Sequence, residues 1–233
     1  MIDLHTHCLP GVDDGARSVE ESLKLLEALK KASFHTVFLT PHVSSKRMLL
    51  GQKETIETAF HALKQAVKDA KLDLELYLGS EFDAHSKTHR ELEEGFTLHQ
   101  SPYVLLDLTY AEHSYEEVLY TLSVLGYKVI LAHVERYGFL SLKELAALKQ
   151  VKGIYCQLNV LSLLKKAPSK HHKRAKQCLK AGLIDVIGTD THRFYPQYET
   201  DLIEALSLCR KKTDAKTFER LTEGFVREAI LNG

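Results

Sequence analysis

Short apolar runs that alternate with amphipathic segments constrain the fold of this chain more than any other feature. Such runs occupy residues 2–4, 36–40, 74–78, 103–108, 128–132, 153–158 and 184–188. Runs of this length, rich in Val, Ile, Leu and Tyr, are typical of buried parallel strands. Because each run is followed by a more polar segment, the pattern predicts strands that alternate with helices.

The segments between these runs carry helical periodicity. Ser18, followed three residues later by Glu21, is typical of a capping box that opens a helix. Further amphipathic patterns cover residues 54–71, 115–125, 142–149, 173–181, 200–211 and 215–231. Gly182 directly follows one of them, where a glycine commonly ends a helix.

Strands alternating with helices predict one α/β domain with a parallel sheet over residues 1–233. The connection at residues 81–102 is too short and too polar for an ordinary crossover, so we expect an irregular excursion with a short helix near residues 88–94. Seven strands fit a distorted (β/α) barrel better than the regular barrel of eight. A doubly wound open sheet is the alternative.

The composition excludes several classes of protein. Lys and Arg total 31 and Asp and Glu total 31, so the chain lacks the basic character expected for binding nucleic acid or an anionic membrane. No apolar run approaches the roughly 18 residues of a membrane span, and the first residues do not resemble a signal peptide. We therefore expect a cytoplasmic protein without membrane insertion, whose 4 scattered cysteines are reduced thiols.

Histidines and carboxylates follow the apolar runs at the ends where parallel α/β folds place their active sites. The chain contains 13 histidines, and ligand-type residues end six of the seven predicted strands. These residues are His5, His7, His42, Glu81, Asp107, His133, Asp190 and His192, with Asp14 in the loop after the first strand. A single histidine at a strand end is usually a surface or core residue, but the joint pattern predicts a binding site.

The spacing within this set indicates metal ions. His5 and His7 are two residues apart, as are Asp190 and His192, so each pair points to one face of an extended strand. Imidazole and carboxylate groups suit Mn, Fe, Mg or Zn. Five histidines and four carboxylates exceed the coordination number of one ion, so the sequence predicts two to three divalent ions.

Several motifs resemble one known family. MIDLHTH at residues 1–7 and LPGVDDG at residues 9–15 resemble the opening of the PHP (polymerase and histidinol phosphatase) superfamily. More narrowly, the chain resembles the bacterial capsule and exopolysaccharide protein-tyrosine phosphatases. Further matching pieces are TPH at 40–42, GSE at 79–81, YVLLD at 103–107, AHVERY at 132–137, QLN at 157–159, DTH at 190–192 and EAIL at 228–231.

The resemblance implies a distorted barrel that holds three divalent ions, usually Mn, Fe or Mg. It implies a first site of His5, His7, Glu81 and Asp190, a second of Glu81, Asp107 and His133, and a third of Asp14, His42 and His192. It also implies hydrolysis of phosphotyrosine, typically on a bacterial tyrosine kinase that controls polysaccharide export.

Two positions depart from the family pattern. The second-site carboxylate is usually Glu, and here it is Asp107, one methylene shorter. The family usually has an Arg-Pro pair a few residues after Asp-x-His, whereas here Arg193 follows at once. Arg136 matches the family's phosphate-binding arginine. We expect substrate contacts from Arg136, Arg193 and Asn159.

The predicted mechanism is attack by hydroxide formed on metal-bound water near neutral pH. Arg136 is the candidate phosphate clamp, and His42 or a loop residue is the candidate proton donor to the leaving oxygen. No cysteine starts a Cys-x5-Arg loop, so we expect no phosphocysteine. The alternatives are a small-molecule phosphatase such as one for histidinol phosphate, a hydrolase of nucleic-acid ends, and a non-catalytic metal-binding regulator. The oligomeric state is left open.

One further feature is a basic run at residues 169–174. We interpret it as the solvated start of a helix. The alternative is a surface that attracts an acidic or phosphorylated partner.

Overall fold

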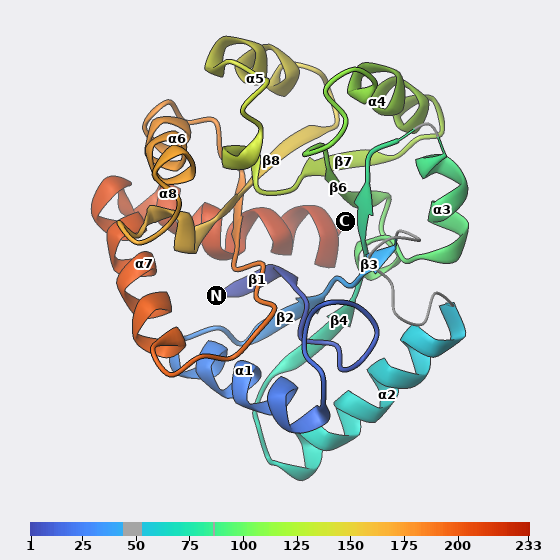
Figure 1. Cartoon of the computed structure of the whole chain (residues 1–233), viewed down its shortest axis with the longest axis vertical. Helices are drawn as coiled ribbons and strands as arrows, with labels where there is room; N and C mark the ends of the chain where they lie inside the picture. The colour runs from blue at the N-terminus through green and yellow to red at the C-terminus, as the bar shows by residue number, and fades with distance from the viewer. Residues whose placement is uncertain (44–52, 86) are drawn as a thin grey trace.

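A curved parallel sheet forms the centre of the molecule, and helices cover its outer side (Figure 1). The computed structural model describes residues 1–43, 53–85 and 87–233. The strands are β1 (Ile2–Thr6), β2 (Thr36–Leu39), β3 (His42–Val43), β4 (Glu75–Leu78), β5 (Glu81–Asp83), β6 (Tyr103–Asp107), β7 (Lys128–Leu131), β8 (Ile154–Asn159) and β9 (Val186–Gly188). Each of the seven predicted runs contains a strand, and β3 and β5 are two short strands that the sequence did not predict.

The strands pair in the order in which they occur along the chain. One sheet has the order β1-β2-β4 and the other β3-β5-β6-β7-β8-β9, and all pairs are parallel. After β9 the chain returns to β1, where the His7 N–H donates to the Thr191 carbonyl and the Asp190 N–H to the His5 carbonyl. A doubly wound sheet reverses its strand order at a switch point, so the alternative fold is wrong.

The helices lie close to their predicted positions. They are α1 (Val19–Lys31), α2 (Lys53–Asp69), α3 (Thr88–Glu94), α4 (Tyr115–Val124), α5 (Leu142–Lys149), α6 (Ser169–Lys180), α7 (Tyr198–Lys212) and α8 (Ala215–Glu219), which continues into π-helical turns at Arg220–Gly224 and Arg227–Leu231. Ser18 caps α1 as predicted, but the Glu21 carboxylate accepts from the Arg17 N–H, so the capping box is only half formed. The short helix expected in the excursion is α3.

The sheet separates two apolar clusters. An outer cluster packs between the strands and the helices, and an inner cluster fills the concave side of the sheet. Along β6, for example, Tyr103 and Leu105 belong to the inner cluster, while Val104 and Leu106 belong to the outer one. This alternation is the period of two that a strand buried on both faces requires.

The C-terminal helical segment closes the inner cluster. Its residues Phe225, Val226 and Ile230 pack with the side chains of the inner cluster, and the segment crosses the middle of the molecule in Figure 1. The inner cluster also contains Ile2 and Leu4 from the start of β1, so the apolar layer lies toward the amino ends of the strands. Polar side chains are therefore left to line the carboxyl ends. Within the described residues, no helix is long and apolar enough to cross a membrane.

Candidate metal centre

All nine predicted ligands meet at the carboxyl ends of the strands. They form three groups in which the candidate ligand atoms lie within 4.8 Å of one another. The groups are His5, His7, Glu81 and Asp190; then Glu81, Asp107 and His133; then His7, Asp14, His42 and His192. These sets match the family-based assignment, with His7 also adjoining the third group. Their roles as ligands remain predictions.

The ring nitrogens of the first group present lone pairs to one another. His7 Nδ1 lies 2.7 Å from Asp13 Oδ2, and His5 Nδ1 lies 3.3 Å from Gln157 Oε1. Both partners are acceptors, so in the neutral rings Nδ1 carries the hydrogen and Nε2 is left without one. The two Nε2 atoms are 3.1 Å apart, so their lone pairs repel each other unless a proton or a metal cation lies between them.

The same four side chains have the spacing of a tetrahedral metal site. His5 Nε2 lies 3.4 Å from Glu81 Oε2 and 3.3 Å from Asp190 Oδ1, and His7 Nε2 lies 3.3 Å from each of these oxygens. Four ligands at bonds of about 2.0–2.1 Å around one tetrahedral ion are about 3.4 Å apart. The residues present therefore fit a divalent ion.

Glu81 connects the three groups. Its Oε1 lies 2.9 Å from His133 Nε2, and its Oε2 lies 2.9 Å from His42 Nδ1. Burial by itself would raise the pKa of Glu81, but the facing histidines outweigh it and hold that pKa well below the usual range. Asp190 behaves alike: burial opposes ionisation, and His5, His7 and Arg136 still hold its pKa well below the usual range. Both carboxylates are therefore charged at neutral pH.

The carboxylates favour positive charge throughout the centre. Burial would lower the pKa of His7, but Asp13 and the neighbouring carboxylates raise it well above its ordinary value. The pKa of His133 is also raised, because the hydrogen bond to Glu81 outweighs burial. An environment that favours protons on buried histidines also favours a metal cation there.

Asp107 reaches the second group despite its shorter side chain. It is 3% exposed, and its Oδ1 accepts from the N–H and the hydroxyl of Thr109 and lies 3.9 Å from His133 Nδ1. Tyr137 fixes the backbone beside it, because the Leu108 N–H donates to its hydroxyl. The contacts from Thr109 and Tyr137 hold the carboxylate at the edge of the centre.

The third group lies nearest to solvent. Asp14 Oδ1 is 3.6 Å from His42 Nε2 and 3.5 Å from His192 Nε2, and the Asp14 side chain is 57% exposed. The His192 ring stacks on that of His7, with ring centroids 4.0 Å apart. The two nitrogens of His42 therefore face carboxylates of two different groups.

The backbone at the centre is unusual at two candidate ligands. His133 has φ 34° and Asp190 has φ 53°, both in the left-handed region that non-glycine residues rarely adopt. Such conformations cluster at functional sites, where the surrounding structure holds them. Gly188 adjoins the same place, and a Cβ there would lie 2.8 Å from the Cβ of His5.

Close approach also explains Gly15 in the loop of Asp14. A Cβ at this position would lie 2.1 Å from the His7 carbonyl oxygen. The Gly15 N–H donates to Asp13, whose other oxygen accepts from His7. The loop therefore folds onto the end of β1 and fixes the His7 ring.

The predicted substrate-binding residues occupy different places. Arg136 Nη2 donates to Asp190 Oδ2, and the Arg136 side chain is 35% exposed, so it lies between the centre and solvent. Arg193 contacts Glu21 at 3.3 Å on the rim. Asn159 is buried: its Nδ2 donates to Asp190 Oδ2 and its Oδ1 accepts from Gln157. These contacts make Asn159 a positioning residue for Asp190.

Sequence reasoning missed the residues that orient the ligands. Asp13 was seen only as part of a motif, yet it holds the His7 ring and also accepts from the His42 N–H. Gln157 faces His5 Nδ1 and accepts from the His133 N–H at 2.6 Å. Asp3 accepts from the backbone N–H groups of His5 and Thr189. Ligand histidines usually have such partners, which is the signal that could have identified them.

Cys8 follows the His-x-His pair but takes no part in the centre. It is fully buried, and burial raises the pKa of its thiol to about 12. A thiol with this pKa is protonated at neutral pH and is a poor nucleophile.

Comparison with known proteins identifies the family. Residues 1–229 match the model of the family described as capsular polysaccharide synthesis, CpsB/CapC. This chain belongs to the CpsB/CapC family. The resemblance noted in the sequence is thereby confirmed at the level of the capsule-related family.

Relatives of the CpsB/CapC family match 82–100% of the chain. The tyrosine-protein phosphatase CpsB of Streptococcus pneumoniae is 30% identical over 247 aligned positions, covering 100% of this chain and 99% of that protein. The putative tyrosine-protein phosphatase CapC of Staphylococcus aureus is 28% identical and covers 82% of this chain and 77% of its own length.

Solved structures share the fold. A chain from the crystal structures of YwqE from Bacillus subtilis and CpsB from Streptococcus pneumoniae, described as unique metal-dependent tyrosine phosphatases, superposes with TM-score 0.78 at 23% identity and covers 94% of this chain and 90% of its own. Dihydropyrimidinase from Brevibacillus agri is more distant, with TM-score 0.64 at 12% identity over 97% of this chain and 69% of its own. The α/β fold with parallel strands is therefore that of the CpsB/CapC family.

Proposed function

We propose that this protein is a metal-dependent phosphatase that hydrolyses phosphotyrosine on a protein substrate. The observation that carries the proposal is a set of four electron-rich atoms at the carboxyl ends of the strands, in which the Nε2 atoms of His5 and His7 lie 3.1–3.4 Å from each other and from oxygens of Glu81 and Asp190. The relatives named tyrosine-protein phosphatases support the substrate class. The capsule-related family supports a bacterial tyrosine kinase of polysaccharide export as the partner.

The three groups are proposed to hold two to three divalent ions. Their mixture of imidazole and carboxylate ligands accepts Mn, Fe, Mg or Zn. When bound, such ions neutralise phosphoryl oxygens and lower the pKa of water. Glu81 faces His5, His42 and His133, and is therefore proposed as the bridging ligand.

The residues of the chain itself orient the substrate. Arg136 is proposed to bind two phosphoryl oxygens, because its planar guanidinium reaches the centre at Asp190 and part of it is open to solvent. Arg193 is proposed to contact the substrate at the solvent-exposed edge of the site. Protonation of the leaving oxygen by His42 would need a nitrogen directed at the substrate, and both of its nitrogens face carboxylates. We therefore propose His42 as a ligand, since a phenolate leaves readily without an acid.

We further propose that residues 1–233 form a single domain built as a distorted seven-stranded barrel. In this description β2 with β3, and β4 with β5, are single strands interrupted at Thr40-Pro41 and Gly79-Ser80. The Glu81 N–H donates to the Pro41 carbonyl and the Gly79 N–H to the Leu39 carbonyl, which supports their continuity. The hydrogen bonds between His5, His7 and the segment after β9 support closure.

The test is a phosphatase assay on protein reconstituted with Mn, Fe, Mg or Zn. A phosphotyrosine peptide, histidinol phosphate and a dinucleotide are compared side by side. We expect the highest kcat/KM on the peptide, complete loss with EDTA, and no loss with a thiol-alkylating reagent, since the Cys8 thiol is buried with a pKa of about 12. A preference for histidinol phosphate would favour the small-molecule phosphatase, and metal binding without turnover of any substrate would favour a regulator.

A further inference from the structure

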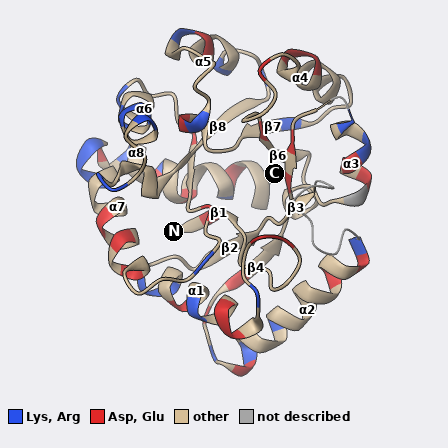
Figure 2. Ribbon diagram, in the orientation of Figure 1, with Lys and Arg blue, Asp and Glu red and all other residues tan. Residues whose placement is uncertain are grey.

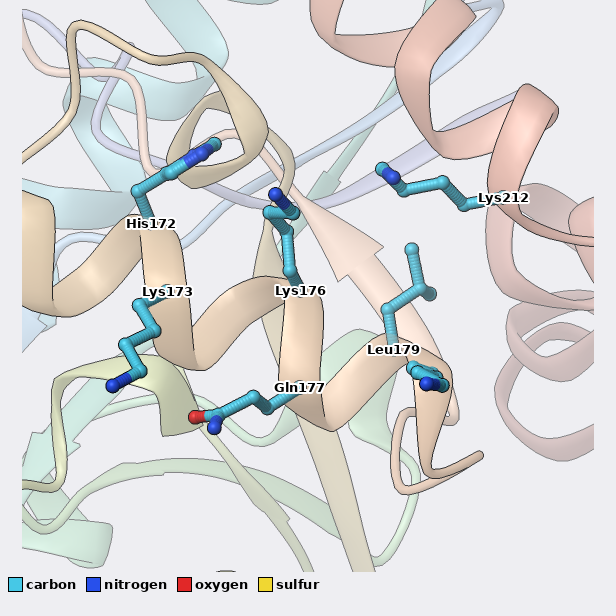
Figure 3. Close-up of a pocket in the computed structure, with 7 residues that line it drawn as sticks. His172, Lys173, Lys176, Gln177, Leu179 and Lys212 are labelled. Carbon is cyan, nitrogen blue, oxygen red and sulfur yellow. The ribbon is translucent and has the colours of Figure 1, made fainter.

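A basic groove lies on the outer flank of the molecule and takes no part in the proposed chemistry. It is about 700 Å³ in volume and lies between α6 and the end of α7. Lys173, Lys176 and Lys180 line it from α6, and Lys212 lines it from α7. Figure 3 shows the side chains of Lys176 and Lys212 directed toward one another. The side chain of Leu179 adds an apolar surface to the wall.

The charge of this groove is unbalanced in a chain whose formal net charge is zero. Helix α6 has the sequence SKHHKRAKQCLK, without Asp or Glu, and α7 ends in Arg210, Lys211 and Lys212. Figure 2 shows the Lys and Arg residues of α6 and those near α8 on the same side of the molecule. Elsewhere, Lys149 and Lys166 pair with Asp185 and Asp201, whereas no ion pair within the described ranges joins a carboxylate to a groove lysine.

The groove adjoins the candidate active site through the amino end of α6. Arg174 Nε donates to the carbonyl of Val134, in the turn Val134–Arg136 that presents Arg136. His172 Nδ1 contacts the Ser162 carbonyl, and the Ser162 hydroxyl donates to Glu135 in the same turn. A polypeptide that leaves the site past Arg136 can therefore continue along α6.

The spacing of the lysines suits a linear anionic chain. Lys173, Lys176 and Lys180 follow one face of a helix, where successive members are roughly 5–6 Å apart at Cβ. Alternate side chains of an extended peptide repeat about every 6.8 Å. The 12 residues of α6 span roughly 18 Å, which about five or six extended residues cover. A run of about six acidic residues would thus span the length of α6.

We propose that this groove docks an acidic stretch of the phosphotyrosine polypeptide whose phosphate enters the metal centre. The inference rests on the proposed function. A polypeptide is favoured over a membrane surface because the lysines line a hollow with an apolar wall at Leu179, whereas lipid headgroups need a broad projecting surface. The docking stretch adds substrate specificity that the metal centre, which contacts only the phosphoryl group, does not provide.

The test compares phosphotyrosine peptides that carry six glutamates with peptides that carry six glutamines. Each type is made in two versions, with the run either before or after the phosphotyrosine. The variant is Lys173→Gln/Lys176→Gln/Lys180→Gln. The matched control, Lys24→Gln/Lys64→Gln/Lys68→Gln, removes the same charge from exposed positions of α1 and α2. p-Nitrophenyl phosphate, which cannot reach the groove, reports on the chemistry alone.

We expect wild-type kcat/KM to favour the glutamate peptide by about tenfold at low ionic strength, because steering by complementary charge commonly gives at least this gain. The preference should disappear in the α6 variant, persist in the control, and shrink at high salt. Activity on p-nitrophenyl phosphate should stay equal in all three proteins. Equal activity of the wild type on both peptides, or a preference that survives in the α6 variant, would overturn the proposal.

Binding separates this proposal from the proposed function. A fluorescent, unphosphorylated glutamate peptide should bind the wild type and the control more tightly than the α6 variant. If it does so while no phosphotyrosine compound is hydrolysed, the proposed function fails and the acidic docking stands. If the groove lysines are instead needed for binding to phosphatidylserine vesicles and the peptides are indifferent to them, the occupant is a membrane and the proposal fails.

Discussion

Burial has opposite effects on stability at the two ends of the strands. At the amino ends, the inner cluster is apolar and is closed by Phe225, Val226 and Ile230. At the carboxyl ends, imidazoles and carboxylates such as His5 and Glu81 are fully buried as well. The apolar end gains stability from burial, whereas the polar end loses hydration that only partners of opposite charge can replace.

The strands therefore carry two layers with separate roles. The apolar layer is the inner cluster at the amino ends, and the polar layer is the set of buried imidazoles and carboxylates at the carboxyl ends. The apolar layer holds the C-terminal segment against the strands. The polar layer keeps charged side chains together at a cost in stability that a bound cation would offset. Substitutions in the two layers should therefore separate stability from activity.

The largest effect is expected from Glu81→Gln in the polar layer. Glutamine keeps the shape but loses the charge that faces His5, His42 and His133. We expect kcat/KM on a phosphotyrosine peptide to fall by at least about 10³-fold, since stabilisation by metal ions is worth several kcal/mol and each 1.4 kcal/mol is about tenfold. Circular dichroism should show a folded protein, and elemental analysis fewer divalent ions.

The control for this variant is Glu117→Gln on the exposed face of α4, which should behave as wild type. A Glu81→Gln protein with more than a tenth of wild-type activity would remove Glu81 from the centre of the mechanism.

The apolar layer should respond in stability alone. Phe225 is 5% exposed and packs against the rings of Tyr103 and Tyr155. Phe225→Ala should lower the free energy of unfolding by about 3–5 kcal/mol, as large-to-small changes of a buried aromatic do. Urea denaturation measures this loss, and kcat/KM well below the unfolding transition should change little. The exposed Tyr120 provides the matched control, because Tyr120→Ala should cost almost nothing.

If Phe225→Ala reduced kcat/KM as strongly as it reduced stability, the two layers would not be separable.

Substitutions of Arg136 test whether this residue binds the substrate or only pairs with Asp190 in the polar layer. A charge-assisted contact of this kind is worth about 1.5–3 kcal/mol, so Arg136→Ala should lower kcat/KM by roughly 10- to 150-fold. Arg136→Lys should recover only part of the loss, because lysine keeps the charge but not the planar fork. Metal stoichiometry should stay unchanged in both variants. Unchanged kcat/KM in the alanine variant would reduce Arg136 to the partner of Asp190 and pass the phosphate role to Arg193.

The smallest effect is expected from Asn159→Ala. This variant distinguishes a residue that orients a metal ligand from one that binds the substrate. Its amide donates to Asp190 and accepts from Gln157, so Asn159→Ala should weaken binding of divalent ions by about tenfold, as loss of a partner that orients a ligand does. The KM for a phosphotyrosine peptide at saturating metal should hardly change. Titration with metal, followed by calorimetry, measures the first quantity. A raised KM with unchanged metal affinity would instead restore the predicted substrate contact.

Local sequence patterns identified most elements because each of those elements is long enough to carry a periodicity or a cap of its own. The run at residues 103–108 became β6, and the Ser18 cap opens α1 as predicted. The short strands β3 and β5 were missed because two residues and three residues carry no periodicity. They exist only because neighbouring strands pair with them.

By itself, the sequence determined the α/β class and the nine candidate ligands, because ligand-type residues follow strand ends and strand ends of a parallel sheet converge. Only the tertiary structure decided which partners hold those ligands. Asp13 orients His7 and Gln157 orients His5, through contacts between separate loops and strands. Asn159 is buried and donates a hydrogen bond to Asp190. Side-chain direction at a buried polar site depends on which hydrogen-bond partners the fold supplies, and some of these, such as Gln157 for His5, come from distant parts of the chain.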